Sequence, residues 1–213
     1  MTSRAASAED SGADSEGTVS PGLRIISPAR PIDQEGVGTA VRSLLLALGH
    51  DPDSEHLART PERVAAAYVE LLTPPEFELT TFANDEDYDE LVLARDIPFT
   101  SLCEHHLLPF HGVAHVGYLP GERIVGLSKL ARMVDRFARS LQVQERLTKQ
   151  VADCLQSELS PKGVGVVLRA EHQCMTLRGV RAHDSATLTS ALHGHLRTDP
   201  AARSEFFALT RGQ

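Results

Sequence analysis

Two short segments with cysteine and histidine at metal-ligand spacing constrain this chain more than any other feature. Cys103 and His106 form a Cys-x-x-His pair, and His172 and Cys174 form a His-x-Cys pair far downstream. Thiolate sulfur and neutral imidazole nitrogen are the ligands that zinc prefers. A tight turn brings the first pair onto one metal ion. We expect a strand to present the second pair, because residues i and i+2 project from one face of a strand. The fold must therefore bring two distant segments together around a transition metal.

The spacing leaves the number of ligands open. If both pairs bind in full, the site is a closed Cys₂His₂ site of the structural kind. If only three of the four side chains bind, water takes the fourth position and the metal can do chemistry. His105 stands beside a ligand and is not needed to complete a tetrahedron. A histidine there is a natural proton-transfer group, because its unperturbed pKa is about 6.5.

Composition and charge restrict the classes of partner. The chain has 213 residues, enough for one domain with a substantial core. Its formal net charge of −8 repels nucleic acids and anionic membranes, so an anionic ligand needs a local basic cluster. Three cysteines do not make a disulfide framework, which indicates a reducing compartment. There is no apolar run near the roughly 20 residues of a membrane span and no signal-peptide core. We therefore expect a cytoplasmic protein that binds neither nucleic acid nor membrane.

The chain divides by composition into three segments. Residues 1–28 are rich in Ser, Ala, Gly, Asp and Glu and poor in large apolar residues, which predicts a disordered acidic tail. Residues 29–80 predict an N-terminal helical region of two helices, each with apolar residues at three- and four-residue steps. Residues 81–213 contain both cysteine and histidine pairs, and we expect them to form the domain that holds the metal site.

Patterning within residues 81–213 predicts elements in the order β-β-α-α-β-β. The expected elements are strands at 91–97, 111–119 and 123–125, helices at 126–141 and 147–159, strands at 164–168 and 187–192, and a helix at 201–209. The strand at 123–125 is expected to return from a hairpin turn at Pro120-Gly121. This order predicts an α+β domain whose antiparallel sheet has helices on one face. Such a sheet has exposed edges, which subunits can protect by joining, so we expect a homo-oligomer.

The expected helix at 126–141 presents a hydroxyl group and two cations opposite its apolar stripe, from Ser128, Lys129 and Arg132. Such a set suits a polyphosphate, because Arg and Lys bind phosphate oxygens through charge-assisted hydrogen bonds. A solvated helix face is the alternative explanation, and the local pattern does not decide between the two. Cys154 falls on the apolar stripe of the next helix and is expected in the core.

Four separated motifs, in this order, resemble the GTP cyclohydrolase I family. The motifs are SLCEHHLLPF at 101–110, GLSKLAR at 126–132, QVQERLT at 142–148 and EHQCM at 171–175, with TPER at 60–63 also in place. The resemblance runs from about Ile32 to the C-terminus. It implies an enzyme that hydrolyses the imidazole ring of GTP, releases formate and forms 7,8-dihydroneopterin triphosphate, the first step of a pterin or folate pathway. It also implies the tunnelling fold, assembled as a decamer of two stacked pentameric rings with sites between subunits.

The resemblance assigns roles around the metal. It implies that Cys103, His106 and Cys174 bind one zinc ion per chain and leave one position for water. His172 and His105 then serve in proton transfer or hydrogen bonding. Zinc lowers the pKa of bound water toward about 7, which provides a nucleophile for purine C8. Protonation of N7 by His105 would make C8 electrophilic.

A GTP-binding set follows from the same resemblance. Glu145 matches the family's guanine anchor, since one carboxylate can accept from both the ring N–H and the exocyclic amine of guanine. Adenine lacks this donor pair, so the base preference follows. Gln144 would line the same pocket. The implied triphosphate cradle consists of Ser128, Lys129, Arg132 and Arg178, with Arg63 from another subunit.

Some positions depart from the family pattern, and other functions compete. Val113, His111 and the pair His183-Asp184 stand where many members have other residues, which bears on loop detail rather than on the reaction. The competing class is a non-catalytic nucleotide-binding or assembly module with a structural Cys₂His₂ zinc site. A third possibility is a sister tunnelling-fold enzyme that acts on a pterin or deazapurine.

Overall fold

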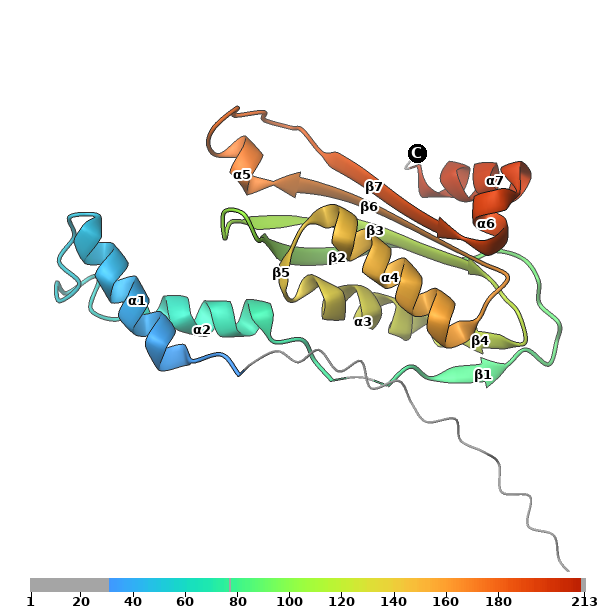
Figure 1. Cartoon of the computed structure of the whole chain (residues 1–213), viewed down its shortest axis with the longest axis horizontal. Coiled ribbons are helices and arrows are strands. Elements are labelled where there is room, and N and C mark those ends of the chain that lie inside the picture. Colours follow the sequence, from blue (N-terminus) through green and yellow to red (C-terminus); the bar gives the residue numbers. More distant parts are fainter. Residues whose placement is uncertain (1–30, 77, 212–213) are drawn as a thin grey trace, which may run out of the picture.

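A five-stranded sheet, in the order β5-β2-β3-β6-β7, forms the centre of the chain (Figure 1). The computed structural model describes residues 31–76 and 78–211, so the tail expected at 1–28 lies outside the described residues. The strands are β2 (Val92–Cys103), β3 (Pro109–Leu119), β5 (Leu141–Gln142), β6 (Gly163–His172) and β7 (Thr187–His193). Neighbouring strands are antiparallel, except that the short β5 runs parallel to the end of β2.

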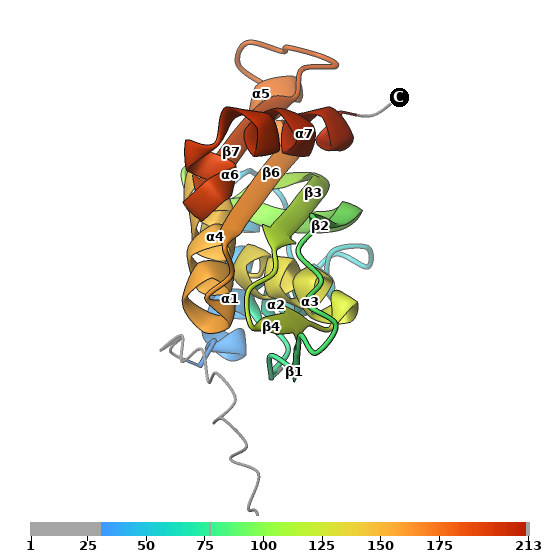
Figure 2. The ribbon, with the colours of Figure 1, turned by 90° about the vertical axis from the view of Figure 1, so that its right-hand side faces the viewer.

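Helices α3 (Leu127–Ala138) and α4 (Gln144–Leu159) cover one face of this sheet and form the main core with it. The alternation along β6 separates this core from a smaller one, because Val166 and Leu168 belong to the main core and Val167 to the other. The smaller core contains Leu196 and Phe206, from α6 (Gly194–Thr198) and α7 (Pro200–Thr210). These C-terminal helices lie across the sheet from α3 and α4 (Figure 2).

The N-terminal helical pair, α1 (Gln34–Ala47) and α2 (Thr60–Leu72), lies beside the sheet domain (Figure 1). No residue of α1, all of which the structure describes, is buried, and Leu44 and Leu46 are more than half exposed. Helix α2 reaches the sheet domain through two hydrogen bonds. The Tyr68 hydroxyl donates to the Leu107 carbonyl at 3.3 Å, and the Arg139 guanidinium donates to the Glu70 carbonyl at 2.7 Å. No helix within residues 31–76 and 78–211 has the length and apolar character needed to span a bilayer.

The predicted α+β class and the order β-β-α-α-β-β are confirmed, but one strand pairing is not. We expected residues 123–125 to return along the preceding strand. Instead β4 (Arg123–Val125) leaves the main sheet and pairs antiparallel with β1 (Thr81–Ala83), which sequence patterning did not predict. The helix expected to end at residue 141 ends at Ala138, because Leu141 and Gln142 form β5 beside β2. Strands β2 and β6 are also longer than expected and continue as far as the cysteine and histidine pairs.

Gly165 provides a test of the smaller core. A Cβ atom at this position would lie 2.7 Å from Cζ of Phe206, and the buried ring has no room to move away. We expect Gly165→Ala to lower the free energy of unfolding by about 1–3 kcal/mol through overpacking. The measurement is the denaturant midpoint at an unchanged slope. Gly38→Ala in α1 is the matched control, since its Cβ would meet only the Pro61 carbonyl oxygen at 3.9 Å. An equal loss in both variants would contradict the prediction.

Candidate metal centre and active site

The Cys-x-x-His pair lies on a tight turn between β2 and β3, as predicted. Strand β2 ends at Cys103, whose carbonyl accepts from the amide of Leu107 at 2.8 Å. The amide of Cys103 donates to the Leu108 carbonyl at 2.9 Å and closes the turn. Leu107 has a φ of 54°, in the left-handed region that closes such turns. The turn brings Cys103 Sγ and His106 Nδ1 to 3.7 Å from each other.

The His-x-Cys pair does not lie on one strand face, and this expectation was wrong. Strand β6 ends at His172, and the next residues form the short helix α5 (Gln173–Thr176). Because the chain changes from extended to helical between His172 and Cys174, their side chains do not project in the same direction. Cys174 packs against the main core beside Cys103. His172 is held elsewhere.

Cys103, His106 and Cys174 form the group that could bind a metal ion among the described residues. Their ligand atoms all lie within 4.8 Å of one another. Burial and the proximity of Cys103 together raise the pKa of the Cys174 thiol. Two thiols this close repel each other as thiolates, and a cation between them removes that penalty. Two sulfurs and one imidazole nitrogen are a donor set that fits zinc.

His172 is fixed outside this group by two contacts. Its ring stacks on Phe110 of β3, with 4.5 Å between ring centroids and 3° between ring planes. Its Nε2 lies 2.8 Å from Oε1 of Gln144. Burial lowers the pKa of His172, which favours the neutral ring. The arrangement thus has three grouped ligands and a fourth candidate held in another hydrogen bond.

Gln144 determines which nitrogen of His172 carries the proton. The amide nitrogen of Gln144 donates to acceptors on β6 and β7, namely Leu168 O at 3.1 Å, Thr187 O at 3.0 Å and Thr189 Oγ1 at 3.1 Å. Its Oε1 can therefore only accept, and Nε2 of His172 must donate. Nδ1 of His172 is then the nitrogen that can accept a proton. Gln144 itself is buried.

His105 is exposed and lies at the edge of the metal group. Its Nδ1 lies 3.9 Å from Cys103 Sγ, and its Nε2 lies 3.9 Å from Oε1 of Glu104. A hydrogen bond from Arg146 lowers the pKa of Glu104, so this carboxyl group is charged. The side chain of His105 is thus free to reach a ligand, while one ring edge faces the metal group and the other faces a carboxylate.

Comparisons with known proteins show the family to which the chain belongs. The model of the family described as GTP cyclohydrolase I matches residues 37–211. The chain belongs to the GTP cyclohydrolase I family. GTP cyclohydrolase 1 of Mycobacterium tuberculosis (strain ATCC 25618 / H37Rv) is 54% identical over 182 residues, covering 83% of this chain and 90% of the relative. GTP cyclohydrolase 1 of Mycobacterium ulcerans (strain Agy99) is 56% identical over 182 residues, again covering 83% of this chain and 90% of the relative.

One solved structure, the archaeosine synthase QueF-Like in the apo form, aligns with 49% of this chain and 93% of its own chain. The identity is 17% and the TM-score is 0.39, so this likeness adds nothing to the family assignment.

The residue that matches the guanine anchor of the GTP cyclohydrolase I family lies near His172. Glu145 is exposed in the first turn of α4, and its charge acts on His172. It borders a surface hollow of about 510 Å³ formed by α4, β7 and the C-terminal helices. Lys149 and Asp153 of α4 and His193 of β7 also line this hollow. No residue of the metal group lines this hollow, which extends from Glu145 toward the C-terminal helices.

The residues implied in the triphosphate cradle are not all brought together in one chain. Arg178 lies close enough to Cys174 for its charge to act on that thiol. Ser128 and Lys129, however, lie in the first turn of α3, whereas Ser101 of β2 contacts the last residue of α3, Ala138. Ten residues of helix span about 15 Å, so this basic turn lies far from the metal group of its own chain.

Arg132 and Arg63 are exposed on α3 and α2. The sequence pattern places Tyr68 on the apolar face of its helix and assigns it no part in the site, although its hydroxyl donates to Leu107 in the turn that carries His106. Cys154 is confirmed in the core, where burial raises the pKa of its thiol to about 12.

Proposed function

We propose that this chain hydrolyses the imidazole ring of GTP, releases formate and forms 7,8-dihydroneopterin triphosphate, as the first step of a pterin or folate pathway. Membership of the GTP cyclohydrolase I family gives the activity, and the residues that match the family's site give the reaction. The observation that carries the proposal is the group of Cys103, His106 and Cys174, with His172 held outside it by Gln144.

This observation bears on the competing function. A structural Cys₂His₂ module needs four protein ligands around the metal. His172 is not among the side chains whose ligand atoms lie within 4.8 Å of one another, so its ring would have to leave its stack on Phe110 to become the fourth ligand. A three-ligand site, with one position left for water, therefore fits the side chains better than a closed one.

The proposed metal is one zinc ion per chain, held by Cys103, His106 and Cys174. When bound there, zinc lowers the pKa of a water molecule to about 7 and so provides a nucleophile at neutral pH. The chain's own residues place the substrate and move protons. His105, exposed at the edge of the group, would donate a proton to N7 of the purine as C8 is attacked. His172, with Nε2–H fixed by Gln144, would accept a proton at Nδ1 in a later step.

Glu145 is the proposed base-recognition residue. Its carboxylate would accept from the ring N–H and the exocyclic amine of guanine, with Gln144 behind it in the same turn. Because adenine offers no such donor pair, ATP would leave the carboxylate unpaired in the bound state. Arg178 would hold the triphosphate, together with Ser128, Lys129, Arg132 and Arg63.

A homo-oligomer completes this proposed site. Ser128 and Lys129 lie at the far end of α3 from the metal group, so a second copy has to supply them. Among the described strands, β7 and most of β2 are sheet edges, which subunit pairing can cover. We propose the family's decamer of two pentameric rings, in the cytoplasm, with residues 81–213 as the catalytic domain and 29–80 as the helical region.

The direct test is to incubate purified, zinc-loaded protein with GTP and to measure formate and, after oxidation, a fluorescent pterin. Both products are expected from GTP in equal amounts, and neither from ATP. Absence of both products with GTP would refute the proposal and favour the non-catalytic module.

Glu145→Ala is expected to weaken GTP binding by about 1–3 kcal/mol, or about 5- to 150-fold. The physical reason is that two donors of guanine lose their shared acceptor. The measurement is the GTP dissociation constant by calorimetry, with zinc content and the unfolding midpoint measured beside it. Glu158→Ala, which removes a carboxylate from the far end of the same helix, is the control and should bind GTP like the wild type. Unchanged GTP affinity in Glu145→Ala would exclude Glu145 as the anchor.

A further inference from the structure

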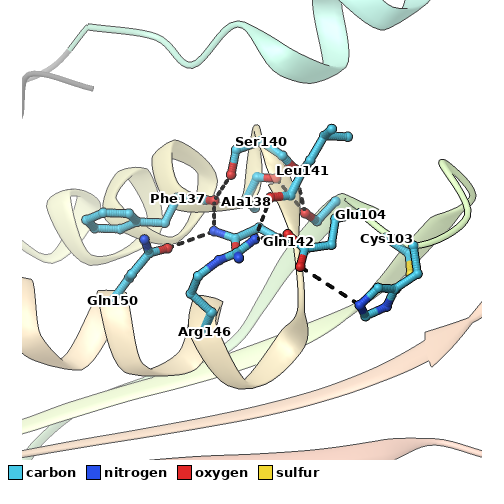
Figure 3. Close-up of polar contacts among 11 residues, drawn as sticks. Cys103, Glu104, Phe137, Ala138, Ser140, Leu141, Gln142, Arg146 and Gln150 are labelled. Carbon is cyan, nitrogen blue, oxygen red and sulfur yellow. Dashed lines mark hydrogen bonds and ion pairs between the residues drawn. The ribbon is translucent and has the colours of Figure 1, made fainter. Parts of the chain in front are cut away.

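An ion pair between Glu104 and Arg146 connects the metal turn to the start of α4 (Figure 3). Nη2 of Arg146 donates to Oε2 of Glu104 at 2.5 Å. Glu104 lies between Cys103 and His105 in sequence, and Arg146 directly follows Glu145. The pair thus joins the turn that holds the proposed metal ligands to the turn that holds the proposed guanine anchor.

The side chain of Arg146 is held by hydrogen bonds to residues that connect α3 and α4. Its Nε donates to Oε1 of Gln142 at 2.8 Å, and its Nη2 donates to the Leu141 carbonyl at 2.7 Å. Gln142 is buried, and its amide nitrogen donates to Phe137 O at 3.0 Å and to Gln150 Oε1 at 2.7 Å. Because that nitrogen has its own acceptors, Oε1 of Gln142 is left for the guanidinium. The planar guanidinium is therefore fixed before it meets Glu104.

The backbone of the metal turn is fixed to the same connection. The amide of Glu104 donates to the Gln142 carbonyl at 3.0 Å, and β5 pairs with β2 at Cys103 and Gln142. Most exposed ion pairs contribute little, since two mobile side chains must be ordered. Here the guanidinium and the backbone of Glu104 already have fixed positions, so the ion pair can fix the orientation of the carboxylate.

The orientation of the Glu104 carboxylate in turn affects the ring of His105. With Oε2 taken by Arg146, the other carboxylate oxygen, Oε1, faces Nε2 of His105 at 3.9 Å. The opposite ring edge of His105, at Nδ1, faces Cys103 Sγ. A separation of 3.9 Å is longer than a hydrogen bond, but catalytic contacts of this kind often shorten only when substrate is bound. The carboxylate attracts the N–H at Nε2 and so turns the Nδ1 edge, which has to carry the proton that the proposed reaction delivers to N7, toward the metal group.

We propose that Glu104 is a positioning residue that orients the His105 ring, and that Arg146 holds Glu104 in place from the turn that carries Glu145. This inference rests on the proposed function, because the ring must be oriented toward a substrate bound at Glu145. Occupation of the guanine site and orientation of the proton donor are then controlled by adjacent residues of one helical turn.

The test is Glu104→Gln, which keeps the size of the side chain. Its single amide oxygen must face Arg146, so an N–H donor replaces the carboxylate oxygen in front of His105. We expect kcat to fall about 10- to 100-fold, while the Michaelis constant for GTP and the zinc content stay at wild-type values. Crystal structures of both zinc-loaded proteins should show one orientation of the His105 ring in the wild type and a different or a divided one in the variant.

Arg146→Met is the second variant, and it tests the same step from the other side. It should show a similar loss in kcat, and the double variant should be no slower than the slower single variant, because both residues act through one ring orientation. Arg42→Met removes an exposed ion pair of the same length, 2.5 Å to Asp53, in the helical pair and should leave kcat unchanged.

Three results would overturn the inference: wild-type kcat in Glu104→Gln, an unchanged His105 orientation in a slow variant, or a zinc loss that matches the loss of kcat. The last result would mean that the ion pair only stabilises the turn that holds the metal ligands. Failure of the proposed function is a separate result, because then the wild type itself would release no formate from GTP.

Discussion

Cys174→Ser is expected to remove zinc and activity together. The three grouped side chains provide two sulfurs and one nitrogen, and a serine hydroxyl is not a ligand that zinc prefers. A site reduced to one thiolate and one imidazole has too few ligands to hold the ion. We therefore expect zinc below one tenth of the wild-type stoichiometry and no detectable formate, a loss of at least about 100-fold. Metal analysis after gel filtration and a formate assay measure both. Cys103→Ser should behave in the same way.

His172→Ala is the decisive comparison for the number of ligands. In the structure, His172 hydrogen-bonds to Gln144 and stacks on Phe110, outside the metal group. Its removal should leave most of the zinc bound, although formate production falls. If His172→Ala loses zinc as completely as Cys174→Ser, the site has four protein ligands. The structural module would then be the better explanation.

The metal turn could be predicted from the sequence because its geometry is local. Cys103 and His106 are three residues apart, and the turn between them is closed by its own backbone hydrogen bonds. The departure of His172 could not be predicted in this way. It depends on Phe110 from the neighbouring strand and on Gln144 from α4, which meet His172 only in the folded chain. The spacing of the cysteine and histidine residues therefore could not decide whether the metal has three or four protein ligands.

The same distinction holds for the fold. Periodicity predicted that α3 and α4 exist, since each buries one stripe against the sheet, but it placed the start of α4 at residue 147 rather than at Gln144. The pairing of β4 with β1 was missed because β1 has only three residues and no alternating pattern to identify it. The position of Ser128 and Lys129 also follows from packing, since the direction of α3 along the sheet decides which end of the helix meets the metal turn. No local pattern reports that direction.

His105→Ala is expected to stop the reaction at its first chemical step while metal and substrate stay bound. His105 is exposed and is not a member of the metal group, so its removal leaves the three ligands in place. In the proposed reaction it delivers a proton to N7 as C8 is attacked, before any later step can occur. General acid catalysis contributes about 10²- to 10⁴-fold, and ring opening should slow by that factor. Single-turnover measurements should find neither formate nor a ring-opened intermediate accumulating.

A catalytic and a purely structural metal site predict different effects of His105→Ala. At a structural site, His105 is only the neighbour of a ligand, and replacing an exposed histidine changes the free energy of unfolding by no more than about 0.5 kcal/mol and nothing else. His56→Ala, in the connection between α1 and α2, is the matched control, since it removes an exposed histidine away from the site. It should open the ring at the wild-type rate. Zinc content, GTP binding and ring opening can all be measured on the same preparation of each variant. If zinc-replete His105→Ala opened the ring as fast as His56→Ala, His105 would have no part in the proton transfer. The proposed role of Glu104 in orienting the His105 ring would then be excluded as well.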